Sequence, residues 1–542
     1  MARAAAARGA PDVALRHLQR ALREDQTPSS RGVLLAELGN AQWLCGDDPI
    51  AAIAHLREAC QLTTDPAVRV EATIVLARAI FSTGDIHGAA AALLQTLDGP
   101  GEFERDDRIR LEAELGSIGL LNLSAMPHVR KRVETFRDLV GDSTEELLML
   151  CNLACLSWLL GTCDETVARA RRALAGGRLL ESVGSDTIAF LQAIWVLRGS
   201  DRLEEARVMC DAALADARER GSAFGFTSCC TMSAMNAIRA GDVRECEAHA
   251  RTGMELPEIP LFVSPPLYAH LALALIERGE LDEAEEALEL GFVGPYLPVL
   301  VHFNVGFYAR GLLRAAQGRD EEAWADLREY GDREALCMIG NPSSPWRLDG
   351  VRTCLRLGHS AEAEALAAEQ EVAAAKWGAS APLGIAVQAR AALSDGQERI
   401  DLLQRAHELL AQSPCRLEQA RVLFELGRAQ RRAGQRRDAQ RRLAEAVALA
   451  RECGATALAT RANDELGVLS ARPKRLQFSG VESLTASERR VAQMAAGGQT
   501  NPQIAQALFV TAKTVENHLG RVYIKLAINS RSQLAQALAD TI

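Results

Sequence analysis

Glycine recurs along most of this chain at a nearly constant interval. The recurrent positions, mostly 37–42 residues apart, are Gly9, Gly46, Gly84, Gly161, Gly199, Gly241, Gly279, Gly318, Gly358, Gly396 and Gly434. Five positions later a small residue usually stands, as at Ala14, Ala51, Ala89, Cys246, Ala284, Ala323, Ala363 and Ala439, whereas Asp401 departs from the pattern. Such a glycine ends a helix in a conformation that other residues resist, and the small residue lets the next helix pack closely. Two amphipathic helices in each period of about 20–50 residues predict an α-solenoid.

The pattern resembles tetratricopeptide repeats, although its period exceeds their usual length of about 34 residues. Aromatic residues make up only 4% of the chain, which favours close-packed helices over sheets. We expect the repeat region to span residues 1–466 and the whole chain to be all-α. Gly9 follows only eight residues, too few for a full leading helix, so the chain resembles the back part of a longer protein.

Thirteen cysteines include no Cys-x-x-Cys pair, so we interpret them as buried thiols and expect no metal site. The six tryptophans are expected to fill the core. No apolar run reaches the roughly 18–20 residues that a membrane-spanning helix needs. The sequence therefore predicts a soluble, cytoplasmic protein that makes no contact with a membrane.

The last part of the chain differs in charge and in local signals. From Lys474 onward eight basic residues face four acidic ones, a net charge of +4, whereas the whole chain carries −10. A basic domain on an acidic body is the asymmetry of a nucleic-acid binder, although a solvated basic face would look the same. Residues 467–483 break the helical pattern and are interpreted as a linker to a domain at 484–542.

Helix-start signals follow one another in this domain. Thr485 with Glu488 and Thr500 with Gln503 form capping boxes, Thr511 can cap a third helix, and a fourth begins at Asn529 or Ser530. A short helix, a turn and a longer basic helix predict a helix-turn-helix. On the third helix Val515, Leu519, Val522 and Leu526 would face the core, and Lys513, Glu516, Asn517, Gly520 and Arg521 would face outward. An amphipathic surface helix of mixed charge is the alternative interpretation.

The domain resembles the LuxR-type helix-turn-helix family. The matching residues are Leu484, Thr485, Glu488, Val491, Asn501, Ile504, Ala505, Leu508, Thr514, Val515, His518, Lys525, Leu526, Arg531 and Leu534. The resemblance implies that the third helix lies in the major groove of double-stranded DNA and that the last helix pairs two subunits. It assigns Glu516, Asn517 and Gly520 to bases, and Thr514, Arg521 and Lys525, with Lys513 beside them, to the DNA backbone. Leu534, Leu538 and Ile542 form the expected dimer stripe.

Two positions depart from the family pattern. Ala527 stands where a glycine usually follows Lys-Leu, and Gly520 puts no side chain where a reading residue could sit. Base recognition would then depend more on Asn517, whose amide can pair with adenine, and on Glu516, which can accept from cytosine.

Helical repeats followed by this domain resemble the large ATP-binding LuxR-family regulators, including the maltose-system activator type. Those proteins carry a nucleotide-switch domain, but no lysine of this chain follows a glycine, so a P-loop is absent and no cofactor is expected. Nor does the chain contain a nucleophile elbow or an HExxH motif, so an enzyme is not expected. The leading hypothesis is a homodimeric transcription regulator whose repeats sense a protein partner or small-molecule inducer. The alternative is a repeat scaffold with a vestigial DNA-binding tail.

Overall fold

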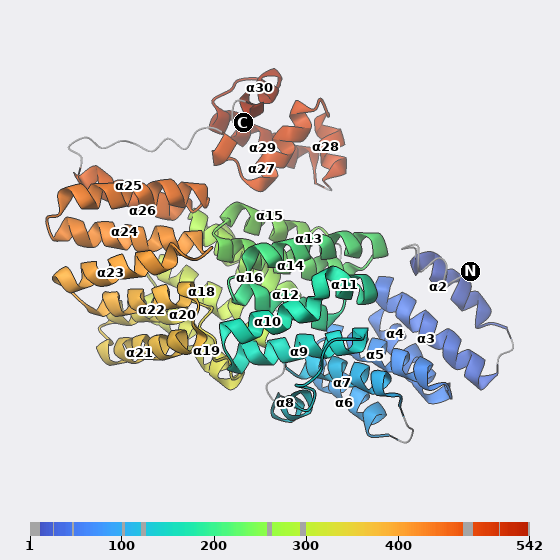
Figure 1. The fold of residues 1–542 in the computed structure, drawn as a ribbon. Helices are drawn as coiled ribbons and strands as arrows, with labels where there is room; N and C mark the ends of the chain where they lie inside the picture. The colour runs from blue at the N-terminus through green and yellow to red at the C-terminus, as the bar shows by residue number, and fades with distance from the viewer. Residues whose placement is uncertain are drawn as a thin grey trace.

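The computed structural model describes residues 11–24, 27–45, 48–99, 103–120, 126–256, 263–292, 300–469, 481–508 and 510–539. Its regular elements are α-helices and short 3-10 helices, so the all-α prediction is confirmed. They form a long array of helices followed by a small separate domain (Figure 1). Gly9, Gly46 and Ile542 lie outside the described residues.

The described helices of the array pack in antiparallel pairs along the chain. In order they are α2 (Pro11–Ala21), α3 (Pro28–Cys45), α4 (Pro49–Leu62), α5 (Pro66–Ser82), α6 (Ile86–Leu97), α7 (Arg105–Gly119), α8 (Met126–Glu134), α9 (Thr144–Leu160), α10 (Cys163–Leu174), η1 (Ala175–Gly177), α11 (Arg178–Val183), α12 (Ile188–Gly199), α13 (Leu203–Arg220), α14 (Ala223–Ala240), α15 (Val243–Gly253), α16 (Ser264–Arg278), α17 (Leu281–Gly291), η2 (Val301–Phe303), α18 (Val305–Ala316), α19 (Asp320–Leu336), α20 (Trp346–Leu357), α21 (Ser360–Trp377), α22 (Ser380–Leu393), α23 (Gly396–Leu410), α24 (Arg416–Arg432), α25 (Arg436–Glu452) and α26 (Thr456–Leu469).

Most of the recurrent glycines that the structure describes lie at the turn between the two helices of a pair. Gly279 shows the predicted geometry: it ends α16 with φ +82° and donates its N–H to the carbonyl of Ile276. On the next helix Ala284 is fully buried, as are the residues at the same offset, Ala89, Cys246, Ala323, Ala363 and Ala439. The solenoid prediction is therefore confirmed in its local detail. Ala51 is an exception, because it is only partly buried while the neighbouring Ala52 is fully buried.

Gly199 serves a different purpose from the one that the pattern predicts. It lies inside the last turn of α12, and the left-handed residue at this turn is Asp201, with φ +58°. A Cβ atom on Gly199 would lie 2.3 Å from Nε1 of Trp158 on α9. Gly199 is thus needed for the close approach of two helices, not for a turn.

The array folds back so that its last helices contact its middle helices. α24 packs against α14 and α26 against α16, and Figure 1 shows the orange end of the array beside the green helices. The backbone N–H of Val243 donates to the carbonyl of Cys453 at 3.0 Å, and the Thr456 hydroxyl donates to the carbonyl of Arg278 at 2.6 Å. Gly241 is required here, because a Cβ atom on it would lie 2.6 Å from the backbone N of Leu417.

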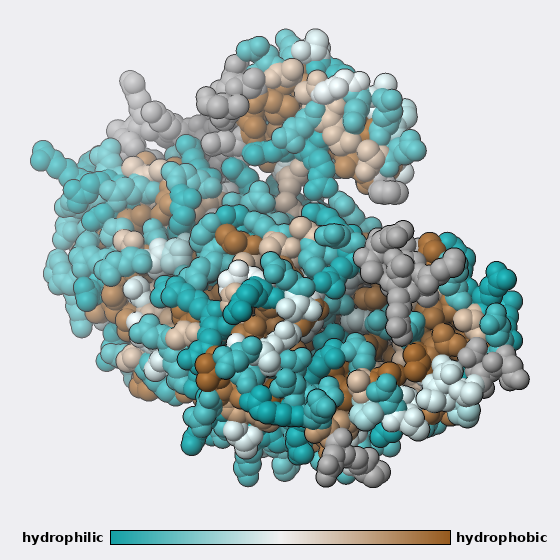
Figure 2. Space-filling view, turned by 45° about the vertical axis from the view of Figure 1, so that its right-hand side comes forward, coloured by the Kyte–Doolittle hydropathy of each residue, from teal (hydrophilic) through white to brown (hydrophobic). Residues whose placement is uncertain are grey.

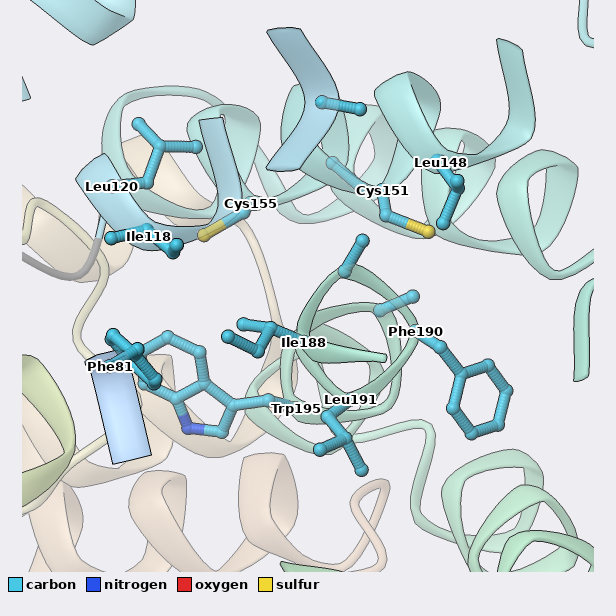
Figure 3. Packing of buried hydrophobic residues seen from close by; sticks show 14 of the residues in the cluster. Phe81, Ile118, Leu120, Leu148, Cys151, Cys155, Ile188, Phe190, Leu191 and Trp195 are labelled. Atoms are coloured by element: carbon cyan, nitrogen blue, oxygen red, sulfur yellow. The ribbon is translucent and has the colours of Figure 1, made fainter. Parts of the chain in front are cut away.

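The core consists of aliphatic, aromatic and thiol side chains. Figure 3 shows Cys151 and Cys155 of α9 among Phe81, Ile118 and Leu148. The cysteines whose side chains the structure describes are free and, apart from Cys60, buried, as predicted. Burial raises the pKa of the Cys155 thiol to about 12, so it stays protonated at neutral pH. The described residues contain no cluster of His, Cys, Asp or Glu that could hold a metal ion.

On the face of the molecule that Figure 2 shows, the surface is mostly hydrophilic, with scattered hydrophobic patches. α26 ends at Leu469, so the helical array extends past residue 466 into the predicted linker. Within the described ranges, none of the helices is both long and apolar enough to span a membrane. The next regular element after α26 is the 3-10 helix η3 (Val481–Ser483).

Candidate nucleic-acid interface

The C-terminal domain is a compact set of helices around its own core. After η3 come α27 (Ala486–Ala496), α28 (Asn501–Ala507), α29 (Ala512–Leu526), η4 (Arg531–Gln533) and α30 (Leu534–Ala539). The buried core contains Leu484, Val491, Ala492, Ala495, Ile504, Ala505, Val515, Leu519, Val522 and Leu534. Val515, Leu519 and Val522 face inward as predicted, and Leu526 packs at the edge of the core.

The predicted helix starts are present. The Thr485 hydroxyl accepts from the N–H of Glu488, and the Glu488 carboxylate accepts from the N–H of Thr485 at 2.9 Å. Thr511 caps α29 by accepting from the N–H of Thr514 at 3.1 Å. The Gln503 side chain accepts from the N–H of Thr500 at 2.8 Å. Because each cap satisfies a backbone group that its helix leaves free, the three starts are fixed by local sequence.

The outward face of α29 is open to solvent. Glu516, Asn517, Gly520 and Arg521 are exposed, and Thr514 is half-buried. The position of a Cβ atom on Gly520 has no other atom within 4 Å, so packing does not require glycine there. The helix therefore presents a polar surface with a local depression at its middle.

The charges at the start of this face are coupled. The Lys513 ammonium donates to the Glu516 carboxylate at 3.2 Å, and both side chains are largely exposed. A pair of this kind contributes little to stability and opens easily. In this conformation Lys513 therefore partly neutralises the charge of Glu516.

Lys525 forms an ion pair within the domain. Its ammonium donates to the Glu488 carboxylate at 2.7 Å, and Glu488 is only 2% exposed. Burial alone would raise the pKa of Glu488, but the hydrogen bonds from Lys525 and Thr485 and the Lys525 charge hold it below its usual value. Lys525 thus joins α29 to α27 as a structural contact.

Leu534 is not available to a second subunit in this conformation. It is 0% exposed in the domain's own core, and Leu538 packs partly against the same core. In this conformation its apolar side chain fills the space beneath α30, and the dimer contact expected of Leu534 stays a prediction. Ile542, the third residue of that stripe, lies outside the described residues.

His518 and Arg531 are half-buried residues of the domain. Burial lowers the pKa of His518, with Arg521 adding repulsion, so the imidazole is neutral at pH 7. The Arg531 guanidinium donates to Oδ1 of Asn501 at 2.7 Å and to the carbonyl of Gln499, which fixes η4 against α28. Both residues maintain the scaffold of the interface.

Ile524 is a candidate that the sequence reasoning missed. It is 81% exposed and lies four residues after Gly520 and eight after Glu516, on the same stripe of α29. The spacing of four residues between Glu516, Gly520 and Ile524 places all three on the outward face. An apolar residue in an amphipathic helix is nevertheless easily assigned to the core face instead.

The domain contacts the array through α27 and α15. The Arg490 guanidinium lies 2.9 Å from the Glu255 carboxylate and also donates to the Thr252 hydroxyl at 3.4 Å. The contact leaves the outward face of α29 exposed. The array and the domain are therefore physically connected without the interface being covered.

Comparison with known proteins agrees with this geometry. Residues 482–538 match the model of the family described as bacterial regulatory proteins, luxR family. The C-terminal domain is therefore a LuxR-family helix-turn-helix domain. A stretch of 60 residues is 45% identical to an HTH-type transcriptional regulator of Mycobacterium tuberculosis, covering 11% of this chain and 7% of that protein.

Two Bacillus subtilis proteins are similar over the same part of the chain. The transcriptional regulatory protein LiaR is 39% identical over 66 residues, 11% of this chain and 31% of LiaR. The spore germination protein GerE is 37% identical over 60 residues, 11% of this chain and 81% of GerE.

Among solved structures, the chain is similar to the APC/C hetero-tetramer Cut9-Hcn1 at a TM-score of 0.41 and 12% identity, covering 94% of this chain and 96% of that one. A tetratricopeptide repeat protein from Parabacteroides merdae gives a TM-score of 0.30 at 17% identity, covering 50% of this chain and 98% of that one.

Proposed function

We propose that this chain is a sequence-specific transcriptional regulator that binds double-stranded DNA with α29 in the major groove. The observation that carries the proposal is the exposed polar face of α29, supported by a helix-turn-helix whose core is formed by apolar residues on the opposite face of that helix, Val515, Leu519 and Val522. An α-helix fits the major groove, where each base pair presents a distinct pattern of donors and acceptors.

The side chains on this face divide into two roles. Asn517 is placed to pair with adenine, and Glu516 to accept from cytosine once Lys513 moves to a phosphate. Thr514 and Arg521 would bind the DNA backbone and fix the register. Gly520 would permit the closest approach between helix and DNA, because it carries no side chain and no neighbour fills the space.

Two further residues take changed or added roles in the proposal. Lys525 acts indirectly, because its ammonium is held by Glu488 and it positions α29 on α27. Ile524 extends the outward stripe and can make an apolar contact with a thymine methyl group.

The proposal includes a homodimer on a two-fold site. With Leu534 in the domain core, a partner would meet the outer side of α30, where Ala535 and Gln536 are exposed and Leu538 is half-buried. Two copies reading one face of the duplex need half-sites about 10–10.5 base pairs apart, or a multiple of that spacing.

The helical array is proposed to act as the sensor or partner-binding module. The contact of Arg490 with Glu255 is one physical connection through which the array could influence the DNA-binding domain. Helical repeats joined to this terminal domain also support placement with the large ATP-binding regulators of the maltose-activator type.

A DNA-binding selection with the purified intact chain tests the proposal. We expect an enriched motif with two-fold symmetry, and Asn517→Ala should change the preference at one base pair. Gln493→Ala is the matched control, because it removes an exposed amide from α27 outside the reading face. No enriched motif at low salt would refute DNA reading, and biological activity that survives deletion of residues 474–542 would favour the scaffold alternative.

A further inference from the structure

A cavity lies where the two halves of the array meet. It has a volume of about 160 Å³ and is lined by residues of α9, α12, α14 and α16 from one side and of α18, α19 and α24 from the other. By comparison, an apolar cavity of about 150 Å³ in another protein binds benzene. The space therefore suits one aromatic ring or an apolar group of similar size.

The walls of this cavity are mostly apolar and aromatic. They include Trp195, Met235, Leu273, Tyr308 and Tyr330, each nine-tenths or more buried. The rings of Tyr308 and Tyr330 lie 5.6 Å apart, and the Tyr308 hydroxyl is engaged by Asp349 at 2.9 Å. A flat apolar molecule would find aromatic surface here that is already held in place.

One cation in the wall has no counter-ion of its own. Among the residues that the structure describes, none forms an ion pair or hydrogen bond with the side chain of Arg198. Its neighbour Arg239 takes the nearby carboxylate of Asp201, at 2.7 Å. Burial, together with the charge of Arg239, lowers the pKa of Arg198 to about 10, so the guanidinium is still charged at pH 7.

Each of the acids that line the cavity has a partner other than Arg198. Glu277 and Glu418 both pair with Arg421. The carboxyl of Glu334 accepts from Nε1 of Trp346 at 2.7 Å, and burial raises its pKa. Arg198 therefore lines the cavity without a hydrogen-bonded counter-ion, which is costly in a partly desolvated site.

We infer that this cavity binds a small organic acid, with its carboxylate on Arg198 and an apolar body of about one ring against Trp195, Met235 and Tyr330. A guanidinium can hold a carboxylate through two parallel hydrogen bonds, which gives both affinity and orientation. The ligand would supply the hydrogen-bonded counter-ion that Arg198 lacks. Only the role of this ligand as an inducer rests on the proposed function; its binding to the cavity does not.

The position of the cavity gives binding a structural consequence. The ligand would contact α14 and α24, which also pack directly on each other where the array closes. α14 pairs with α15, the helix that contacts α27 of the DNA-binding domain. Occupancy would thus stabilise the closed array on which that domain rests.

Calorimetric titration of the intact chain tests the inference directly. The probes are benzoate, phenylacetate and indole-3-acetate, each compared with its neutral amide. We expect at least one acid to bind at least 10-fold more tightly than its amide and to change tryptophan fluorescence, because Trp195 lines the site.

Variants distinguish binding at this cavity from a nonspecific effect of removing an arginine. Arg198→Met should bring the ratio of acid to amide affinity close to 1 and raise the melting temperature of the ligand-free chain, because a partly buried guanidinium without an ion-pair partner is removed. Arg432→Met, the same change at an exposed position of α24, should alter neither. Met235→Trp should fill the space and weaken acid and amide alike.

The possible outcomes distinguish this inference from the proposed function. If no acid of the panel binds better than its amide, or if Arg198→Met leaves the ratio unchanged, the inference is overturned even when a DNA motif is enriched. If an acid binds through Arg198 but no DNA motif is enriched, the binding site stands and the proposed function fails.

Discussion

Replacing Lys525 by Met separates a structural role of this residue from a direct contact with DNA. The variant leaves the Glu488 carboxylate, which is 2% exposed, with only the N–H of Thr485 as its partner. Breaking a fully buried pair costs about 3–5 kcal/mol. The Lys525 side chain is 30% exposed, so water can enter in its place, and we expect the variant to lose about 2–3 kcal/mol of folding stability.

Amide hydrogen exchange in the intact chain measures this loss. It should increase the opening of α29 by roughly 30- to 150-fold, since each 1.4 kcal/mol is about a factor of ten. Adding Glu488→Gln should recover part of the stability, because the second change removes the unpaired charge.

The salt dependence of DNA binding tests whether Lys525 contacts a DNA phosphate directly. Each phosphate contact contributes about 0.9 to the slope of log K against log salt concentration. Lys525→Met should leave the slope unchanged, whereas Arg521→Met, at an exposed position, should reduce it by about 0.9 and leave exchange in α29 unaffected. A reduced slope with unchanged exchange in Lys525→Met would refute the structural role.

Four further predictions concern the same domain. Ala527→Gly should stabilise the end of α29 by about 0.5–1 kcal/mol and so slow its amide exchange, because Ala527 is held at φ +53°, a conformation that glycine adopts more easily. Unchanged exchange would mean that the turn is unstrained. Gly520→Ala should stabilise α29 by about 0.5–1 kcal/mol yet weaken DNA binding, and binding that improves along with stability would argue against a close approach at this position. Asn517→Ala should lose about 1–3 kcal/mol of discrimination at one base pair, measured on single-base variants of the selected site. Because the folded pKa of Glu488 lies below its usual 4.5, its stabilising effect is present above pH 4.5 and disappears as the pH falls through the folded pKa; thermal unfolding of Glu488→Gln should therefore depend less on pH in that range.

The sequence by itself determined the features that depend on neighbours along the chain. The glycine interval predicted the helical pairs, and the caps at Thr485 and Thr511 predicted where α27 and α29 begin. These features are readable because a cap or a helix-ending glycine acts within a few residues of its own position. The inward and outward faces of α29 follow for the same reason, since both obey the period of one helix.

Only the tertiary structure decided which distant residues meet. The pairing of Lys525 with Glu488, the burial of Leu534 and the contact of Arg421 with Glu277 all join separate helices. Arg198 is the clearest example of what the sequence does not reveal. The residues around it in the chain do not show that Arg239 pairs with Asp201, or that Arg198 lines a cavity between the two halves of the array. Local sequence fixes each helix and its faces, whereas the superhelical path of the array sets which faces come together and which charge is left without a partner.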